Sequence, residues 1–500
     1  MIRRAAIWLI LTSLLAAGAP LTAPAPMPRP SIAPPDAAAL VAEARLSGDV
    51  AYLLYDLDAR TVVEARLAEL PLPPASVAKA PTALYALDRL GPDFRFETRL
   101  ITSGTVANGV LKGDLILQGG GDPELDTVDL DALAVEAARI GLKRVDGRFL
   151  VDDTLLPVIE QIDDTQPVMA AYNPSVSAMN LNFNRIHAEW KRTSAGYDMK
   201  VEARSEGLSP PSSAATVQIV DATTSGQIFD YARAENVERW SVARKALGRG
   251  GARWLPVRDA ARYAGLTFRD VAKARGISLP MPEIGAAPTI ADVIARHASR
   301  PVARISRDML RYSTNLTAET LGLMATRAGG GTPSGLEGSA SAMGSWARRF
   351  ATMPPGSMAL VNHSGLSGAS RTTASSIAAL MISAAETGFA APAGEPSSLF
   401  DLMAEFRIWT RDDPAPPVEA IVKAKTGTLN FTSALAGYLV TEQRRRFAFA
   451  ILTADLDRRA ALASSRAEAP RGARGWAGRS RQLQRDLLKS WVARFGRAEG

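Results

Sequence analysis

The chain of 500 residues contains no cysteine and only three histidines. The absence of cysteine excludes disulfides, a cysteine nucleophile and zinc sites built from thiolates. The histidines, His187, His297 and His363, form no His-Glu-x-x-His zinc motif, and no Gly-x-Ser-x-Gly elbow surrounds a serine. We therefore expect neither a metal nor a cofactor. A Ser-His-Asp triad stays open, although the three histidines are more typical of structural or surface positions.

Lysine is scarce as well, since ten of the 58 basic residues are lysines and the others are arginines. Arginine stays protonated at any working pH, whereas a buried lysine can lose its proton and act as a base. Each lysine of this chain is therefore worth examining for a role that arginine cannot fill.

The net charge of +7 is modest for a chain of this length. Basic residues form no stripe with interleaved aromatic residues, so we expect no nucleic-acid partner. The charge fits equally well a protein that works outside the cytoplasm, next to an anionic cell wall.

The N-terminus has the pattern of a secretory signal peptide. Arg3 and Arg4 precede an apolar run, Ala5 to Ala17, which small residues follow at 16–19. The run is shorter than the ~20 residues that a membrane-spanning helix needs. We predict a signal peptide over 1–19 and a Pro/Ala-rich linker over 20–35, with an uncleaved membrane anchor as the alternative. No later segment has the length and hydropathy of a membrane span.

The rest of the chain is too long for one core, so two or three domains are expected. A β-hairpin is predicted near the start, and a helix, Ala75 to Leu90, follows it. Helices are predicted again over 290–327, interrupted near Ser313, and three strands then form an antiparallel meander before a loop at 458–481. The strands and the final helix are expected at Val50–Tyr55, Thr61–Ala65, Val418–Thr428, Ala434–Thr441, Arg446–Leu452 and Gln482–Phe495.

The first turn of the early helix carries the stretch PPASVAKA, with Ser76 and Lys79 three residues apart. Residues three apart on a helix share a face, so the serine hydroxyl and the lysine amine can meet. A serine becomes a nucleophile when a base lies beside it, and a desolvated lysine is one such base. A Ser-x-x-Lys pair also arises by chance about once in a chain of this composition, and an ordinary exposed pair is the alternative.

Two further motifs follow in the chain. Ser313-Thr314-Asn315 lies between two helical runs, where a helix cap is the alternative. Lys425-Thr426-Gly427-Thr428 ends a strand, where a simple turn is the alternative. Ser-x-x-Lys, Ser-x-Asn and Lys-Thr-Gly, in this order and on helix, loop and strand, form the pattern of penicillin-binding proteins and serine β-lactamases.

The spacing and several longer stretches narrow this pattern. More than two hundred residues separate Ser76 from Ser313, far more than in a class A β-lactamase. From about residue 45 to 455 the chain closely resembles the D-alanyl-D-alanine carboxypeptidase/endopeptidase family typified by penicillin-binding protein 4. The resemblance lies in NGVLKGDLILQGGGDPEL, VDGRFLVDD, AYNPSVSAMNLNFN, SRPVARISRDMLRYSTNLTAE, NHSGLSGASR and KAKTGTLNFTSALAGYL.

The resemblance implies an α+β multidomain fold, in which a transpeptidase-like domain of antiparallel sheet and helices is split by a large β-rich insertion. We expect the catalytic domain at 36–95 and 288–500, the insertion at 96–287, and a nested subdomain at about 195–245. The implied activity is hydrolysis of D-Ala-D-Ala ends and peptide cross-links in peptidoglycan, in the periplasm. Peptidoglycan peptides and, as covalent inhibitors, β-lactam antibiotics are the implied partners, and a homodimer is left open.

The resemblance also implies roles for the motif residues. Ser76 is the acylated nucleophile and Lys79 its base; Ser313 and Lys425 relay a proton to the leaving amine; Asn315 holds the substrate amide. Thr426, Gly427 and Thr428 belong to the strand that binds the substrate carboxylate, and the backbone N–H groups of Ser76 and Thr428 form the oxyanion hole. Asp152, with Asp153 as the neighbouring candidate, is the expected reader of a diaminopimelate amine, and a strand-end turn is the alternative.

Two departures from the family pattern stand out. The middle residue of the second motif is Thr314 in place of Asn or Asp, which we expect to be tolerated. Asn362-His363 precedes Ser364 and Gly365 where the family usually has Asp-Gly, and we expect this change to tune substrate access. A β-lactamase and a slow peptidoglycan-binding or penicillin-sensing module stay open as rival functions.

Overall fold

The computed structural model describes residues 35–497 apart from 226, 235–236, 391–395, 411–412, 414–415, 417 and 463–469. The predicted signal peptide and nearly all of the predicted linker lie in 1–34, outside the described residues. Within the described part of the chain, no helix combines the length and the hydropathy that crossing a bilayer requires.

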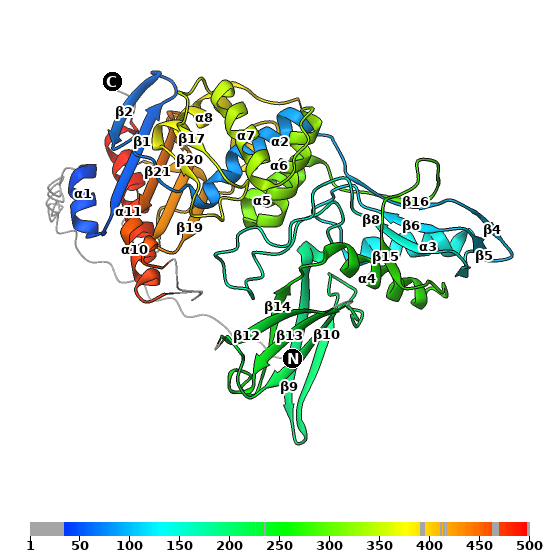
Figure 1. The fold of residues 1–500 in the computed structure, drawn as a ribbon. Helices are drawn as coiled ribbons and strands as arrows, with labels where there is room; N and C mark the ends of the chain where they lie inside the picture. The colour runs from blue at the N-terminus through cyan, green and yellow to red at the C-terminus, as the bar shows by residue number, and fades with distance from the viewer. Residues whose placement is uncertain are drawn as a thin grey trace, which may run out of the picture.

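A five-stranded antiparallel sheet forms the centre of the larger domain, in the order β19-β20-β21-β1-β2 (Figure 1). The predicted hairpin and meander are confirmed as its strands. The two sets pair through β1 and β21, where Asp49 lies opposite Ala454, so the sheet joins the two ends of the described chain. The strands are β1 (Asp49–Asp56), β2 (Thr61–Arg66), β19 (Ala420–Leu429), β20 (Thr432–Thr441) and β21 (Arg446–Ala454).

Helices cover both faces of this sheet. On one face, α11 packs its leucines and Trp491 against alternate strand residues such as Tyr52 and Phe449, and α1 lies beside it. On the other face, α8 and a helical layer containing α2, α5, α6 and α7 enclose the largest hydrophobic core. The helices are α1 (Ala37–Ala44), α2 (Lys79–Leu90), α5 (Val302–Tyr312), α6 (Asn315–Ala328), α7 (Leu336–Phe350), α8 (Ala374–Glu386), α9 (Leu399–Leu402), α10 (Leu456–Ala460) and α11 (Ala473–Phe495).

The last helix is longer than predicted. It begins at Ala473, not at Gln482, and the last three residues of α10, 458–460, also fall in the segment predicted to be a loop, so that prediction is wrong for both stretches. The buried Trp476 explains the extension: its ring meets Phe431 edge-on at 6.2 Å, and its Nε1 donates to the Ser47 carbonyl oxygen at 3.0 Å. Tertiary burial of this one aromatic residue outweighs the low helical preference of the surrounding glycines.

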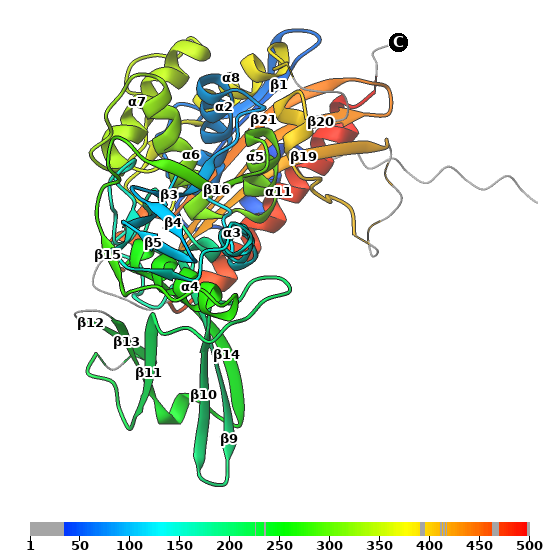
Figure 2. The same ribbon diagram turned by 90° about the vertical axis from the view of Figure 1, so that its right-hand side faces the viewer.

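A second five-stranded sheet lies in the insertion, in the order β15-β8-β6-β3-β16, with α3 and α4 against one face (Figure 2). A tight turn at Asn108-Gly109 joins β4 to β5, and both of its residues have positive φ. The elements are β3 (Glu97–Thr102), β4 (Thr105–Ala107), β5 (Val110–Lys112), β6 (Leu115–Gln118), β7 (Arg144–Val145), β8 (Phe149–Asp152), β15 (Pro282–Ile284), β16 (Asp292–Ala298), α3 (Thr127–Arg139) and α4 (Ala260–Ala274).

Strand β16 corrects the helix predicted from residue 290. Ile290, Val293 and Ile294 have helical spacing, but residues 292–298 pair with β3 instead, with His297 opposite Thr98. The free edge of β3, nearly two hundred residues earlier in the chain, pairs with this segment and makes it a strand. Because β16 completes the sheet of the insertion, we propose that the insertion ends near residue 298 rather than 287.

Two small sheets form a nested unit at the far end of the insertion (Figure 2). One has the order β10-β9-β14 and the other the order β11-β13-β12. We propose that the nested unit runs over about 185–256, wider than the 195–245 expected from the sequence. Its strands are β9 (Arg185–Thr193), β10 (Gly196–Glu202), β11 (Ala215–Val220), β12 (Phe229–Ala234), β13 (Val237–Ala243) and β14 (Gly250–Pro256).

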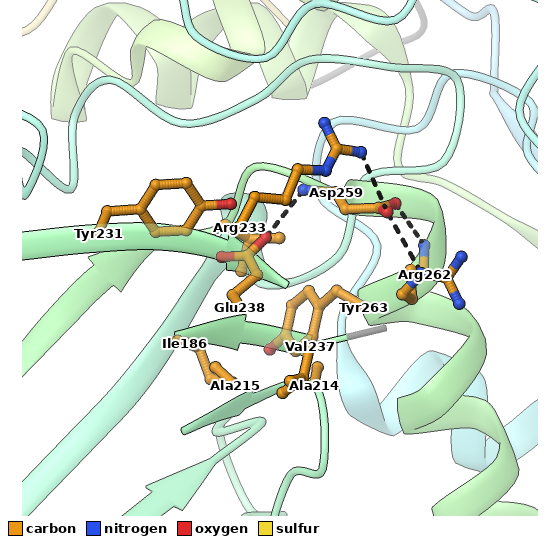
Figure 3. Close-up of a pocket in the computed structure, with 11 residues that line it drawn as sticks. Ile186, Ala214, Ala215, Tyr231, Arg233, Val237, Glu238, Asp259, Arg262 and Tyr263 are labelled. Atoms are coloured by element: carbon orange, nitrogen blue, oxygen red, sulfur yellow. Dashed lines mark hydrogen bonds and ion pairs between the residues drawn. The ribbon is translucent and has the colours of Figure 1, made fainter. Parts of the chain in front are cut away.

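A buried carboxylate lies in a small pocket where this unit meets helix α4 (Figure 3). Glu238 Oε1 accepts hydrogen bonds from the backbone N–H groups of Arg258 and Asp259, at 2.6 and 2.9 Å. Its Oε2 is buried without a hydrogen-bond partner among the described residues, as is the Tyr231 hydroxyl. Burial raises the pKa of Glu238 to about 7, although the two N–H donors oppose the shift.

This raised pKa predicts a pH-dependent stability. The folded protein keeps a proton on Glu238 that the unfolded chain releases above its ordinary pKa, so stability falls as pH rises from about 5 to about 7. Glu238→Gln retains an acceptor for the two N–H groups without the charge. Between pH 5 and pH 8, we expect the unfolding free energy of the wild type to fall by about 1–3 kcal/mol more than that of the variant. The measurement is the unfolding free energy of both proteins at the two pH values.

Glu206→Gln is the matched control, because Glu206 is an exposed acid of the same nested unit. Its unfolding free energy should follow that of the wild type at both pH values. A pH dependence that is the same in Glu238→Gln and in the wild type would contradict the prediction.

Candidate active site

Ser76 lies in a short 3-10 helix, Ala75–Ala78, that leads directly into α2, which confirms its predicted place at the start of a helix. Ala75 has a φ of 45°, in the left-handed region that residues with a side chain seldom adopt, so the turn at the nucleophile is strained. A Cβ at Gly365 would lie 1.9 Å from the Ala75 carbonyl oxygen, and one at Gly427 would lie 2.8 Å from Ser76 N. The two glycines therefore let a loop and strand β19 approach the Ser76 backbone closely.

Lys79 is completely buried beneath Ser76, with its Nζ 3.0 Å from Ser76 Oγ. Nζ also donates to Asn315 Oδ1 at 2.7 Å and to the Ser364 carbonyl oxygen at 2.9 Å. Burial, reinforced by the charge of Lys425, holds the pKa of Lys79 well below its usual range. A neutral amine has two N–H bonds and one lone pair. The two carbonyl-type oxygens take the N–H bonds, which leaves the lone pair to accept the Ser76 proton.

The second motif connects α5 to α6. Ser313 ends α5 in the left-handed conformation, with φ 59° and ψ 36°, and Asn315 begins α6. This reversal brings Ser313 and Asn315 to the same cleft as Ser76. Asn315 joins two domains, because its Oδ1 accepts from Lys79 while its Nδ2 donates to the carbonyl oxygen of Tyr172, in the insertion, at 2.8 Å.

The third motif lies on the edge strand β19. Lys425 is buried, and burial lowers its pKa to about 8. Thr426 and Thr428 are exposed and alternate with the buried Lys425 and Gly427, so the two threonines share one face of the strand. Lys425 Nζ donates to the Thr426 carbonyl oxygen at 2.9 Å. A lysine with this pKa is mostly charged at neutral pH but gives up its proton more readily than an ordinary lysine, which suits a group that passes protons.

These residues meet at one cleft of about 820 Å³. Ser76, Ser313, Asn315 and Thr428 line it, while Lys79 lies buried behind Ser76 and Gly427 packs against the Ser76 backbone. The three motifs are thus brought together from helix, loop and strand, although Lys425 and Thr426 are not among the residues that line the cleft.

Asp152 is not brought to this cleft. Its carboxylate accepts four hydrogen bonds inside the insertion, from Gln118, from the backbone and hydroxyl of Thr154, and from the Ala287 backbone. Neither Asp152 nor Asp153 lines the cleft. The pKa of Asp153 is raised to about 6, mainly by burial. This geometry favours the strand-end role that the sequence left as the alternative.

The sequence did not point to a buried carboxylate, that of Glu319, which lies near Lys79. Glu319 is completely buried and accepts the backbone N–H groups of His363 and Ser364, at 2.8 and 2.9 Å. It thereby fixes the Ser364 carbonyl that receives Lys79 Nζ. Its position four residues after Asn315 places it one helical turn from the motif, a signal that the sequence offered.

His363 does not tune access to the cleft, contrary to the expectation. Its ring is completely buried, with Nε2 2.8 Å from Ser339 Oγ, and burial lowers its pKa to about 3. A Cβ at Gly322 would lie 2.2 Å from the ring, so a glycine on α6 provides the space. The histidine is a neutral core residue of the loop that carries Ser364.

One group of side chains in the nested unit has metal-ligand chemistry. Ligand atoms of His187, Glu189 and Glu202 lie within 4.8 Å of one another. Arg204 already pairs with both carboxylates, at 3.1 and 2.6 Å, and so supplies the cation there. In the cleft, the described lining residues include no histidine or carboxylate, and hence no such ligand.

Comparison with known families covers nearly all of the described chain. The D-Ala-D-Ala carboxypeptidase 3 (S13) family matches residues 36–471. The chain belongs to this family. It is therefore a serine-type D-Ala-D-Ala carboxypeptidase, and the Ser-x-x-Lys, Ser-x-Asn and Lys-Thr-Gly stretches all lie within the matched residues.

Individual relatives agree with this membership. A D-alanyl-D-alanine carboxypeptidase of an Actinomadura species is 27% identical over 387 residues, 73% of this chain and 70% of that protein. The crystal structure of penicillin-binding protein 4 from Haemophilus influenzae is 20% identical, covers 90% of this chain and 99% of that one, and has a TM-score of 0.70. A complex of the latter with a β-lactam has a TM-score of 0.66 at 18% identity, over 90% of this chain and 98% of that one. These likenesses confirm the predicted α+β multidomain fold.

The buried Glu319 gives a prediction about the base. Its negative charge raises the pKa of Lys79, against the larger effects of burial and Lys425. Glu319→Gln removes that charge, so Lys79 should become neutral at lower pH. We expect the acidic limb of the rate of acylation by penicillin to move to lower pH, measured by stopped-flow or gel-based labelling across the pH range.

Glu337→Gln, which changes an exposed acid on α7, is the control and should leave the pH profile unchanged. An acidic limb that stays in place in Glu319→Gln, or moves to higher pH, would show that Glu319 does not act on Lys79 through its charge.

Proposed function

We propose that the protein hydrolyses the D-Ala-D-Ala ends of peptidoglycan peptides, and the peptide cross-links between them, through an acyl-enzyme on Ser76. The observation that carries this proposal is the buried Lys79 Nζ, 3.0 Å from Ser76 Oγ and held by two further oxygens. We also propose that the protein works in the periplasm, which rests on the predicted signal peptide. A homodimer stays a prediction.

In the proposed reaction, Lys79 accepts the Ser76 proton while Ser76 Oγ attacks the carbonyl carbon of the penultimate D-Ala. The backbone N–H groups of Ser76 and Thr428 receive the negative charge that develops on the carbonyl oxygen. The C–N bond then breaks, and the leaving amine takes a proton passed through Ser313 from the lysine pair. Water next attacks the ester, with Lys79 again accepting the proton, and Ser76 leaves as its hydroxyl.

Substrate binding in this proposal follows the edge strand. A substrate peptide lies between β19 and Asn315, with its terminal carboxylate on Thr426 and Thr428 beside Lys425. Supporting this, Gly427 leaves no side chain between the strand and Ser76, so the scissile carbonyl can lie against the Ser76 backbone. The side-chain amide of Asn315, which already links Lys79 to the insertion, borders the same space.

The rival β-lactamase function is less well supported. A β-lactamase needs a base that activates water against a penicilloyl ester whose leaving group stays tethered. The described residues that line the cleft include no carboxylate or histidine that offers a second base. The slow sensing module is disfavoured by the complete set of motifs.

Lys79→Arg tests the base directly. Arginine stays protonated at working pH and therefore offers no free lone pair, so the variant should lose acylation by at least about 1000-fold, in line with the removal of a general base. The measurement is labelling by a fluorescent penicillin, followed over time, with circular dichroism to check the fold. Labelling within a few-fold of the wild type would overturn the assignment of Lys79.

A second prediction separates the peptidase from the β-lactamase. One preparation should release D-Ala from a D-Ala-D-Ala peptide with repeated turnover, because the free D-Ala departs and admits water. With penicillin it should form an adduct on Ser76 that persists orders of magnitude longer than the peptide acyl-enzyme. Mass spectrometry of the protein and an assay of free D-Ala follow the two reactions. Rapid penicillin turnover without D-Ala release would favour the β-lactamase instead.

A further inference from the structure

A loop of the insertion, residues 160–175, forms part of the wall of the catalytic cleft; we call it the cleft loop. Its two ends are joined by Ile159 and Val176, which exchange backbone hydrogen bonds at 2.9 and 2.8 Å. The loop contains no helix or strand, so contacts outside regular secondary structure have to fix its shape. The residues of the loop that line the cleft are Thr165, Gln166, Pro167 and Tyr172.

The side chain of Arg258 holds this loop. Arg258 lies between β14 and α4, does not line the cleft, and is only 5% exposed. Its guanidinium donates to three backbone carbonyl oxygens of the cleft loop. Nη1 donates to those of Glu160 and Asn173, at 3.2 and 2.7 Å, and Nη2 donates to that of Val168 at 2.7 Å. One planar group thus binds the beginning, the middle and the end of the loop.

Burying this cation is costly. Burial lowers the pKa of Arg258, and the nearby carboxylate of Glu238 opposes the shift. Glu238 lies beside the start of α4 and accepts the backbone N–H of Arg258 at 2.6 Å, so it fixes the backbone from which the guanidinium extends (Figure 3). An apolar side chain of similar size often stabilises a core as well as a buried ion does. The arginine is therefore better explained by the loop that it binds than by stability.

The cleft loop in turn contacts a motif residue. The Tyr172 carbonyl oxygen accepts from Asn315 Nδ2 at 2.8 Å. The peptide unit that carries this carbonyl is held on its other side, because the N–H of Asn173 donates to the Ala170 carbonyl oxygen at 2.9 Å. The next carbonyl, that of Asn173, is the one that accepts from Arg258 Nη1. The acceptor for Asn315 is thus one residue away from a carbonyl that Arg258 holds.

A fixed acceptor on this side determines which way the Asn315 amide points. Its Nδ2 faces the Tyr172 carbonyl, so its Oδ1 faces Lys79 and accepts from Nζ at 2.7 Å. An amide has donors at one end and an acceptor at the other. Without the Tyr172 carbonyl, the amide is free to turn over and to aim its N–H bonds at Lys79. The lone pair of Lys79 would then accept from the amide and would no longer be available to Ser76.

We propose that Arg258 is a positioning residue of the acylation step: it holds the cleft loop so that the Tyr172 carbonyl keeps the Asn315 oxygen turned toward Lys79. This inference rests on the proposed function, in which Lys79 is the base. Arg258 touches no substrate in this reaction and acts through Tyr172 and Asn315. The insertion thereby supports the chemistry of the catalytic domain as well as bordering its cleft.

Arg258→Ala tests the proposal on the full-length protein. Because small displacements of a catalytic group slow a reaction severely, we expect acylation by a fluorescent penicillin to fall by about 10–100-fold. The kcat for release of D-Ala from a D-Ala-D-Ala peptide should fall with it. Arg258→Lys keeps a buried cation but lacks the planar fork, so it should lose less than the alanine variant. Arg239→Ala is the matched control and should match the wild type, because Arg239 is exposed on β13 of the same nested unit.

A double-mutant cycle with Asn315→Ala separates positioning from general damage to the fold. If Arg258 acts through Asn315, Arg258→Ala should slow acylation by less than about twofold once Asn315→Ala is already present. A merely structural role would cost the same factor in both backgrounds. The slow acylation that remains in the Asn315→Ala background is followed by mass spectrometry of the protein.

The outcomes separate this inference from the proposed function. Equal losses in the two backgrounds, or an Arg258→Ala variant that is acylated as fast as the wild type, would overturn the positioning role and leave the proposed function standing. If circular dichroism shows that Arg258→Ala is unfolded, Arg258→Lys takes its place in the cycle and the same two outcomes decide. A wild type that forms no adduct on Ser76 and releases no D-Ala would overturn the proposed function itself.

Discussion

The whole active site depends on keeping one amine uncharged. Lys79 Nζ is completely buried, and its two hydrogen-bonding oxygens, Asn315 Oδ1 and the Ser364 carbonyl, come from segments more than two hundred residues further along the chain. A protonated ammonium there would have no water and would lie near Lys425, so the neutral form is favoured. Several surrounding elements contribute to this state. Helix α6 brings Asn315, the loop brings Ser364, and β19 brings Lys425, whereas the charge of Glu319 on α6 opposes it.

The second constraint is close approach at the nucleophile. Three backbone segments meet within van der Waals distance at Ser76: the strained turn at Ala75, the loop at Gly365 and the strand at Gly427. Any side chain at the two glycines would push the segments apart and open the oxyanion position to water. The strain at Ala75 persists because these neighbours fix the turn from both sides. Packing of the backbone, rather than any one side chain, therefore sets the geometry in which the Ser76 hydroxyl meets a substrate.

Local sequence predicted the elements that local forces decide. The early hairpin, the helix carrying Ser76 and Lys79, and the meander whose first strand carries Lys-Thr-Gly were all confirmed, because alternation and turn residues specify them. The prediction failed where partners distant in the chain decide the secondary structure. The apolar residues at 290–294 have helical spacing, but β16 pairs with β3 in a sheet. Burial of Trp476 likewise extends α11 into an Ala/Gly/Arg-rich stretch. Within the site, the motifs identified the residues that touch substrate in the proposed reaction. They did not identify Glu319 or the packing of His363 against Gly322, since burial and pairing across the fold leave no local motif.

The pairing of β1 with β21 also sets the timing of folding. Asp49 and Ala454 are opposite each other in the sheet but about 400 residues apart in the chain. At ~5–20 residues per second, a ribosome makes the second strand roughly 20–80 s after the first. Until then the hairpin of β1 and β2 has an unpaired edge, and the oxygens that hold Lys79 follow it by more than two hundred residues. The sheet of the insertion is completed by β16, so the whole insertion is synthesised well before β21. It is therefore able to fold before the sheet of the catalytic domain is complete. A nascent chain of this protein therefore holds its nucleophile inactive until synthesis is nearly finished.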